Sequence, residues 1–501
     1  MSAAAAPAAQ IIRGALLADP AKPRAQPADI LITGGVIAAI GPPGLAAPDG
    51  ATAIDAANTL VHPGLINAHM HSHGGLARGQ GDKWTLELLL AAAPWLGGNR
   101  ALADKKLSAT ICAAEMVLKG CTAAYDLFAE FPLPTSEGMD AVAEAYAEVG
   151  MRAVIAPMVA DLSFYQAIPG LLDALPDDLR RATDSLRPGD GAACLAAIEA
   201  IARHWSWDHA GIRLGVAPTI PHHCTEGFVC GCGRIARANG LRLHTHVGES
   251  KVQAVVGQRL YGRTLLQQMH HWGIVGPDFT AAHGVWLDDA DLRLLAETGG
   301  NLAHNPGSNM RLGNGLFPLR RALDLGVTVG LGTDGANCSD NQNMYEAMRY
   351  ASMASKVQSP RVEEWAAVED VYHAATAGSA RALGFADAGE IRVGAKADLV
   401  FLDLRAINWI PHNRTVNQLV HAEDATSVRH VMIGGRLVVH DRMLTTVDLV
   451  RLAREAEAAR ERLEAATAEV KALADKLSVV VGSFCPGLAA EPYQVRRYVR
   501  E

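Results

Sequence analysis

The chain has 501 residues, a formal net charge of −8 and 49% hydrophobic residues, which predicts a globular protein of two or three domains, or one large barrel with attachments. The acidic balance provides no basic surface for nucleic acid, and no run of 18 uncharged apolar residues is present to span a membrane. Residues 1–7 lack the charged and leucine-rich regions of a signal peptide, so we expect a disordered leader and a cytoplasmic protein.

Two segments of the chain are rich in short apolar runs and glycine turns. Residues 1–60 contain Ile30-Leu-Ile-Thr-Gly-Gly-Val-Ile, and residues 386–446 contain Asp398-Leu-Val-Phe-Leu. Both patterns are typical of strands joined by tight turns. Because neither half is expected to form a stable sheet alone, we predict that the two segments pair in one small β-sandwich.

Residues 61–385 alternate short apolar runs with longer amphipathic segments, which indicates βα units and a parallel sheet. Eight runs have the pattern of strands: 64–70, 121–127, 152–159, 212–218, 241–246, 279–284, 300–304 and 327–333. This α/β pattern predicts a (β/α)8 TIM barrel, in which catalytic groups lie at the C-terminal ends of the strands.

The last segment, 447–501, begins with a long helical pattern. Apolar residues recur every three or four positions from 449 to 477 and form a continuous seam. This seam can pack on the chain's own barrel, or it can form the contact of a homodimer through Leu463 and Val470. Residues 478–501 carry no functional signal.

His69 and His71 lie at the end of the first predicted barrel strand, in Pro63-Gly-Leu-Ile-Asn-Ala-His-Met-His. Residues i and i+2 of a strand share a face, so both imidazoles can reach one ion. His246 and Asp334 follow at the ends of two later strands. Three imidazoles and one carboxylate predict a site for one divalent metal, zinc first and iron second, with room for a water whose pKa the ion lowers toward about 7.

The groups around this set are suited to proton transfer. Glu249 follows His246 by three residues, where a turn can bring its carboxyl beside the metal without binding it, so that it can give a proton to a substrate. Asp334 can accept a proton from the water. His283 can orient hydroxide or stabilise a developing oxyanion.

These motifs, together with His244-Thr-His-Val-Gly-Glu, Ala281-Ala-His, His304-Asn-Pro-Gly-Ser-Asn and Gly332-Thr-Asp-Gly, closely resemble the amidohydrolase superfamily. The nearest likeness is the branch of cytosine, guanine and S-adenosylhomocysteine deaminases and triazine chlorohydrolases, over about residues 10–446. It implies one metal on His69, His71, His246 and Asp334, with Glu249 as proton donor to a ring nitrogen and His283 as orienter and electrophile. Two-metal members usually carry a bridging lysine on a middle strand, and the fourth predicted strand here has none.

The substrate pocket is less well determined. Nucleoside-type relatives carry an acidic residue that binds the ribose hydroxyls, where this chain has Pro94-Trp-Leu-Gly-Gly-Asn-Arg. A ribose without acceptors is poorly discriminated, so we expect a substrate other than a nucleoside. Trp84 and Trp95 are candidates to stack on a flat ring, with packing in the core or a lid as the alternative. His73 and Asn309 are further candidates for the pocket.

The resulting hypothesis is a hydrolytic deaminase of a small amino-substituted nitrogen heterocycle, of purine, pyrimidine, pterin or triazine type. The same site could instead hydrolyse a C–Cl, C–N or C–S bond of a triazine, urea or thiocarbamate, and a catalytically inactive scaffold is a remote alternative. We interpret Cys224, Cys230 and Cys232, which lie near His222 and His223, as buried small side chains, with a structural zinc as the alternative.

Overall fold

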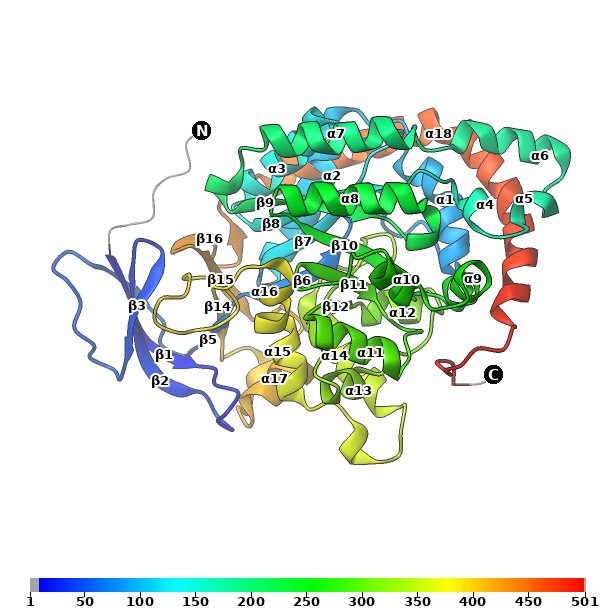
Figure 1. Cartoon of the computed structure of the whole chain (residues 1–501). Helices are drawn as coiled ribbons and strands as arrows, with labels where there is room; N and C mark the ends of the chain where they lie inside the picture. The colour runs from blue at the N-terminus through cyan, green and yellow to red at the C-terminus, as the bar shows by residue number, and fades with distance from the viewer. Residues whose placement is uncertain (1–8, 500–501) are drawn as a thin grey trace.

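An eight-stranded parallel sheet forms the centre of the computed structural model, which describes residues 9–499 (Figure 1). The expected N-terminal leader lies outside the described residues. The strands follow chain order: β6 (Leu65–Met70), β7 (Cys121–Ala129), β8 (Arg152–Val159), β9 (Ile212–Pro218), β10 (Arg242–Val247), β11 (Phe279–His283), β12 (Asn301–His304) and β13 (Thr328–Leu331). The N–H of Asp334 donates to the carbonyl of His69 at 3.0 Å, which joins the two edges. Each predicted strand overlaps one of these strands, and the barrel is confirmed.

Helices cover the outside of the barrel between successive strands. Those of the barrel are α1 (Leu86–Gly97), α2 (Leu102–Leu118), α3 (Ser136–Val149), α4 (Phe164–Ala167), α5 (Leu171–Ala174), α6 (Asp177–Ala182), α7 (Gly191–His204), α8 (Glu226–Ala238), α9 (Lys251–Tyr261), α10 (Leu265–His271), α11 (Asp289–Thr298), α12 (Pro306–Arg311), α13 (Leu319–Asp324), α14 (Met344–Lys356), α15 (Val368–His373) and α16 (Ser379–Leu383). Local sequence sets their bounds. The Thr135 side chain accepts from Gly138 N–H at the start of α3, and Gly150, with φ +84°, ends that helix.

The inside of the barrel is filled rather than hollow. Every residue of β6 and of β11 is buried, as expected for strands covered on both faces. Small side chains and one tyrosine meet in the interior: Ile66, Ala68, Ala123, Tyr125, Ala217 and Ala303. This packed interior gives the residues at the C-terminal ends of the strands a rigid base.

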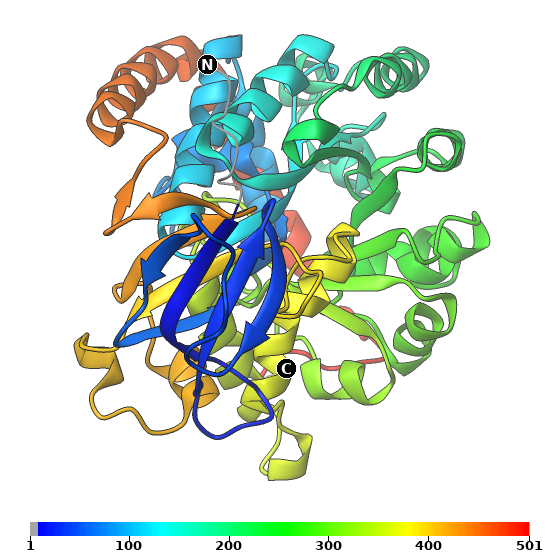
Figure 2. The ribbon, with the colours of Figure 1, turned by 90° about the vertical axis from the view of Figure 1, so that its left-hand side faces the viewer.

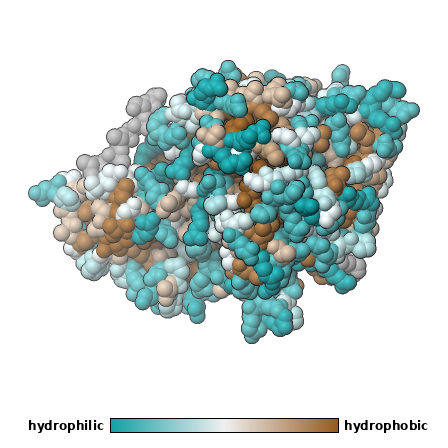
Figure 3. Space-filling view, viewed as in Figure 1, coloured by the Kyte–Doolittle hydropathy of each residue, from teal (hydrophilic) through white to brown (hydrophobic). Residues whose placement is uncertain are grey.

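The two flanking segments pair in one nine-stranded sheet, which lies beside the barrel in Figure 1 and faces the viewer in Figure 2. Its strands are β1 (Ala9–Leu17), β2 (Gln26–Thr33), β3 (Val36–Gly41), β4 (Thr52–Asp55), β5 (Thr59–Pro63), β14 (Leu399–Asp403), β15 (Val428–Ile433), β16 (Arg436–His440) and β17 (Met443–Leu444). The antiparallel pair β5–β14 joins the flanks. Two glycine turns meet across the sheet, where a Cβ at Gly435 would lie 3.0 Å from Gly35 Cα. The face of the molecule that Figure 3 shows is mostly hydrophilic, with a hydrophobic patch over the small sheet.

The C-terminal helix α18 (Leu449–Ala489) is longer than predicted. Its residues Leu477, Val481, Cys485 and Leu488 are buried in one cluster with Ala91 of α1 and Leu171 of α5. Within the predicted seam, Ala459, Leu463 and Leu477 are buried, which supports packing on the chain's own barrel, and the homodimer stays a prediction. One 18-residue window of α18 reaches a mean hydropathy of 1.3, which by length and composition alone would suffice to cross a membrane, but apolar side chains of this helix already have partners within the chain.

Candidate active site

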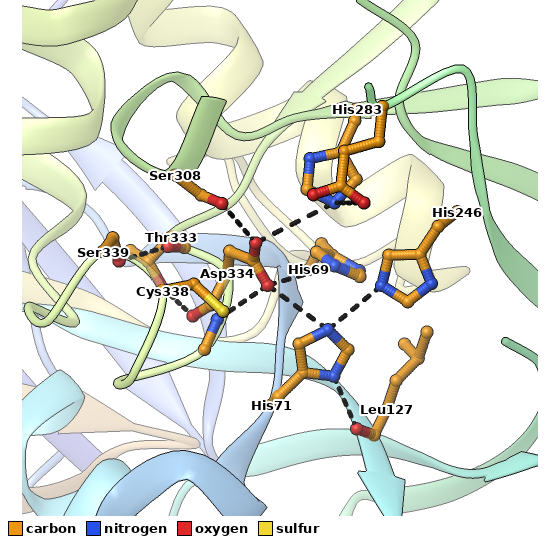
Figure 4. A network of polar contacts seen from close by, with 12 residues as sticks. His69, His71, Leu127, His246, His283, Ser308, Thr333, Asp334, Cys338 and Ser339 are labelled. Carbon is orange, nitrogen blue, oxygen red and sulfur yellow. Dashed lines mark hydrogen bonds and ion pairs between the residues drawn. The ribbon is translucent and has the colours of Figure 1, made fainter. Parts of the chain in front are cut away.

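The four side chains that we predicted to bind a metal converge at the C-terminal ends of the barrel strands (Figure 4). The donor atoms of His69, His71 and His246 lie within 4.8 Å of one another, and so do those of His69, His283 and Asp334. Asp334 Oδ1 is 3.6 Å from His69 Nε2 and 3.2 Å from His71 Nε2. Side chains that lie far apart in the sequence thus meet in one buried cluster.

Backbone carbonyls set the orientation of two of these imidazoles. His71 Nδ1 donates to the carbonyl of Leu127 at 2.7 Å, and His246 Nδ1 donates to that of Thr219 at 2.6 Å. In the neutral tautomers that present Nε2 as a metal ligand, both Nε2 atoms carry lone pairs, and they are only 3.1 Å apart. Neither ring nitrogen of the buried His69 has a hydrogen-bond partner. Lone pairs that face each other at this distance repel unless a cation lies between them, so this donor set fits a metal ion.

The protonation states also suit a cation. Burial lowers the pKa of His69 to about 3 and that of His246 well below its usual value, so both rings are neutral, which is the form that binds metals. Burial opposes ionisation of Asp334, but the imidazoles of His69, His71 and His283 around it hold the pKa of this carboxyl well below its usual range. Neutral imidazoles and one carboxylate are a donor set for a divalent metal.

Two residues of the site have a backbone conformation that the sequence patterns did not predict. His283 has φ +70° and Asp334 has φ +61°, in the left-handed region that residues other than glycine rarely adopt and that costs about 1–3 kcal/mol. For Asp334 this cost is offset locally, because Gly335 N–H donates to its Oδ1 at 2.7 Å and Gln342 Nε2 donates to its carbonyl at 2.8 Å. Strain at this position aims the carboxylate at the histidines.

Glu249 lies beside this cluster in a buried position. Its Oε2 is 3.6 Å from His283 Nε2, and Asn314 Nδ2 donates to its Oε1 at 3.1 Å. Burial and the nearby carboxylates of Asp334 and Glu87 raise the pKa of Glu249 well above its usual value. This shift favours the protonated form of Glu249, which can act as an acid.

His283 is held by Asn309. The Nδ1 of His283 lies 2.9 Å from Asn309 Oδ1 and donates to it, so Nε2 carries a lone pair. This Nε2 lies 3.9 Å from Asp334 Oδ2, and burial lowers the pKa of the ring. A neutral ring with this tautomer accepts a hydrogen bond, which favours the orienting role over the electrophilic one. Asn309 therefore contributes to the site by holding the ring of His283 in place.

A cavity of about 690 Å³ opens over the cluster, a size typical of small-molecule sites. His71, His246, Glu249 and Asp334 line one end, and the predicted pocket residue His73 lies on its wall. The remainder of the lining is largely aliphatic, and its aromatic and charged side chains include Arg100, Lys105, Phe128, Glu130, Phe131, Phe164, Tyr165 and His223. Patterns in the sequence did not single out the Lys105–Glu130 ion pair, because its members come from different elements.

Trp84 and Trp95 do not line this cavity. Trp84 packs partly buried against an apolar cluster, and Lys471 of α18 lies 5.4 Å from the centre of the Trp95 ring. The predicted stacking of these rings on a substrate in this cavity is therefore not supported by their positions, and packing is the role that the structure gives them.

The cysteine cluster lies apart from the metal donors. Cys224 and Cys232 are buried within the main apolar core, and burial raises the pKa of both thiols. Among the described residues, the groups that could hold an ion contain no cysteine. This supports the interpretation of the cluster as buried small side chains.

Comparisons with known proteins agree with this geometry. A model of the "Amidohydrolase family" matches residues 60–438. The chain is 32% identical over 450 residues to a 5-methylthioadenosine/S-adenosylhomocysteine deaminase of Syntrophobacter fumaroxidans, with 88% of this chain and 94% of the relative covered.

Two solved structures with bound zinc are similar. An adenosine deaminase from Xanthomonas campestris has a TM-score of 0.78 at 25% identity and covers 91% of this chain and 98% of its own. A variant of atrazine chlorohydrolase from Arthrobacter aurescens, complexed with zinc and atraton, has a TM-score of 0.80 at 25% identity and covers 90% and 99%. Together with the donor set, they support a divalent metal at this site.

Proposed function

The chain belongs to the amidohydrolase family, and we propose that it is a metal-dependent hydrolytic deaminase that releases ammonia from an amino-substituted nitrogen heterocycle. One observation carries this proposal. The carboxyls of Glu249 and Asp334 lie 3.6 and 3.9 Å from the same atom, His283 Nε2, and their pKa values are shifted in opposite directions, up for Glu249 and down for Asp334. Deamination of a ring requires such a pair, a proton donor and a proton acceptor.

We propose zinc as the metal, with iron as the second candidate. His69, His71, His246 and Asp334 would hold it, and the zinc in both similar structures supports this choice. When bound, the metal supplies Lewis acidity that lowers the pKa of water toward about 7.

The side chains of the chain then move the protons. Water adds through its oxygen to the ring carbon that bears the amine, and Asp334 takes the proton that this water loses. Glu249 gives its own proton to the adjacent ring nitrogen. Asp334 passes its proton to the amine, the C–N bond breaks, and ammonia leaves. The hydroxyl left on carbon returns a proton to Glu249, so the product is a ring carbonyl and both carboxyls recover their starting states.

A second candidate is release of chloride, or of an amine or thiol, from the same site. The similarity to atrazine chlorohydrolase favours keeping it, because the site determines the attack on the ring more strongly than the group that departs. Measuring ammonia and chloride over a panel of heterocycles separates the two. We also propose a cytoplasmic location, which the eight free cysteines support.

The variant Glu249→Gln tests the proposed function. It keeps the shape of the side chain and removes its acidic proton, so we expect kcat to fall by about 10²- to 10⁴-fold with the metal content unchanged. Glu199→Gln, at an exposed position of α7, is the matched control. A Glu249→Gln protein that keeps its metal and turns over at the wild-type rate contradicts the role of Glu249.

A further inference from the structure

The last described residues return to the active-site end of the barrel. After α18 the chain turns and passes α9, as the red trace in Figure 1 shows. Arg259 of α9 pairs with Glu491 at the start of this tail, and Gln494 Nε2 donates to Asp288 Oδ2 at 2.6 Å. The tail, residues 490–499, therefore lies against the barrel.

Arg497 connects the tail to two loops at once. Its Nε donates to the carbonyl of Val285 at 2.7 Å, and its Nη2 donates to that of Leu287 at 2.8 Å. Its own carbonyl accepts from Leu316 N–H at 3.0 Å. A planar guanidinium can reach two carbonyls with a fixed geometry that a lysine ammonium cannot reproduce. Although burial lowers its pKa to about 10, this group stays charged at neutral pH.

The two carbonyls flank Trp286, whose side chain is buried. The tail also touches this ring directly, because Tyr493 and Tyr498 approach it edge-on with ring centres 6.0 and 5.1 Å away. Contacts between aromatic edges and faces stabilise such an arrangement. Trp286 is thus held from the tail through both its backbone neighbours and its side chain.

Trp286 in turn touches the groups that place Glu249. Its backbone N–H donates to the carbonyl of Gly248 at 2.8 Å, and its Nε1 donates to the carbonyl of Asn314 at 2.8 Å. Asn314 donates through Nδ2 to Glu249 Oε1. The same loop begins at His283, only two residues before Val285. The contacts that join Trp286 to Gly248, Asn314 and Glu249 are hydrogen bonds, and the link to His283 is the polypeptide chain itself.

We propose that Arg497 is a positioning residue, which sets the place of Glu249 and His283 by holding the two loops that carry Trp286 and Asn314. This inference rests on the proposed function, because it assigns Glu249 the role of proton donor. It assigns the tail, for which no role could be predicted from the sequence, a function in positioning the catalytic residues from a distance. The contacts of Arg497 are with backbone, so the effect depends on loop position rather than on charge at the reacting atoms.

Arg497→Ala tests the inference, with Arg497→Lys as the conservative variant. Loss of the two-carbonyl contact lets the loops shift, and a displacement of about 1 Å can cost about 100-fold in rate. We expect kcat to fall by about 10- to 100-fold with KM changed by less than about threefold, and Arg497→Lys to fall between this variant and wild type. Val499→Ala, at a position 83% exposed on the same tail, is the matched control.

Two further measurements separate positioning from general damage. Hydrogen exchange should become faster at the amides of Trp286 and Leu316 in Arg497→Ala while the rest of the barrel stays protected. Free guanidinium, at a concentration that leaves the wild-type Tm unchanged, should restore part of kcat. Rescue together with local exchange supports the inference.

Wild-type kcat in Arg497→Ala overturns the inference. So does a loss of activity that comes with loss of metal, a large drop in Tm and no rescue by guanidinium. Glu249→Gln measured in parallel keeps the two proposals apart. If Glu249→Gln is inactive and Arg497→Ala is fully active, only the role of the tail fails, and an active Glu249→Gln protein refutes the proposed function itself.

Discussion

The hydroxyl of Ser308 donates to Asp334 Oδ2 at 2.5 Å, the oxygen that does not face His69 and His71 (Figure 4). Asp334 Oδ1 faces His69 and His71, so this bond holds the carboxylate in the rotamer that a metal requires. In Ser308→Ala the carboxylate keeps the bond from Gly335 N–H to Oδ1 but loses the one at Oδ2, so it is less restrained and metal binding must immobilise it further. We expect the metal to bind more weakly in this variant.

The magnitude follows from two independent estimates. A hydrogen bond to a charged group contributes about 1.5–3 kcal/mol, and about 1.4 kcal/mol corresponds to a tenfold change in Kd, which together predict a weakening of about 10- to 150-fold. Loss of a residue that supports a metal ligand typically costs about 10- to 100-fold in affinity. The two ranges overlap, so we expect about a 10- to 100-fold higher Kd for zinc in Ser308→Ala.

Competition with a chromogenic chelator measures this Kd directly on the metal-free protein. Ser339→Ala is a matched control, because Ser339 Oγ donates at 2.5 Å to the carbonyl of Thr333 next to the same loop and does not touch a predicted ligand. Equal zinc affinity in the Ser308 and Ser339 variants would refute the view that Ser308 holds Asp334 for the metal.

Three further outcomes are expected. Asn314→Ala removes a hydrogen bond that lowers the pKa of Glu249, and the pKa of Glu249 should therefore rise. Because the protonated form is the active one, the alkaline limb of the plot of kcat against pH should move to higher pH. A shift of this limb to lower pH contradicts the prediction. In denaturant unfolding, Leu477→Ala, at a fully buried position, should cost about 2–5 kcal/mol, whereas Val479→Ala, 72% exposed, should stay within about 0.5 kcal/mol. Since residues 94–100 bring no carboxylate to the cavity, kcat/KM should be higher for a free aminopurine than for its ribonucleoside, and the reverse order would show that the ribose is bound another way.

Much of the metal site could be predicted because its signals are local. The two-residue spacing of His69 and His71 on an apolar strand places both rings on one face, and the barrel pattern places His246 and Asp334 at the same rim. These four side chains converge because the barrel brings the C-terminal ends of its strands to one rim, and not because of the chemistry of the side chains. The left-handed backbone at His283 and Asp334 leaves no such pattern, because it depends on contacts made only after the strands are assembled.

Contacts between distant segments carry no periodic signal either. Arg497 lies 212 positions from Val285, whose carbonyl it holds, and the tail that carries it shows neither a motif nor a strong hydrophobic period. Residue type alone made Arg497 indistinguishable from its exposed neighbour Arg496. The same limit applies to the Lys105–Glu130 pair, since nothing in either segment indicates that their helix and strand end face each other.

The prediction that Trp95 lines the substrate cavity failed for a different reason, which is the position of this residue on its helix. The cavity is lined from α1 by residues at helical spacing: Leu86, Leu89, Leu90, Ala93, Pro94, Leu96 and Gly97. These positions share one face of a helix, and Trp95, directly after Pro94, points away from it toward Lys471 of α18. A flat aromatic ring suggested stacking on a flat substrate, but no helix had been assigned to these residues. Once its bounds are known, periodicity alone removes Trp95 from the cavity and makes the leucines of α1 the apolar wall against which a heterocycle would lie.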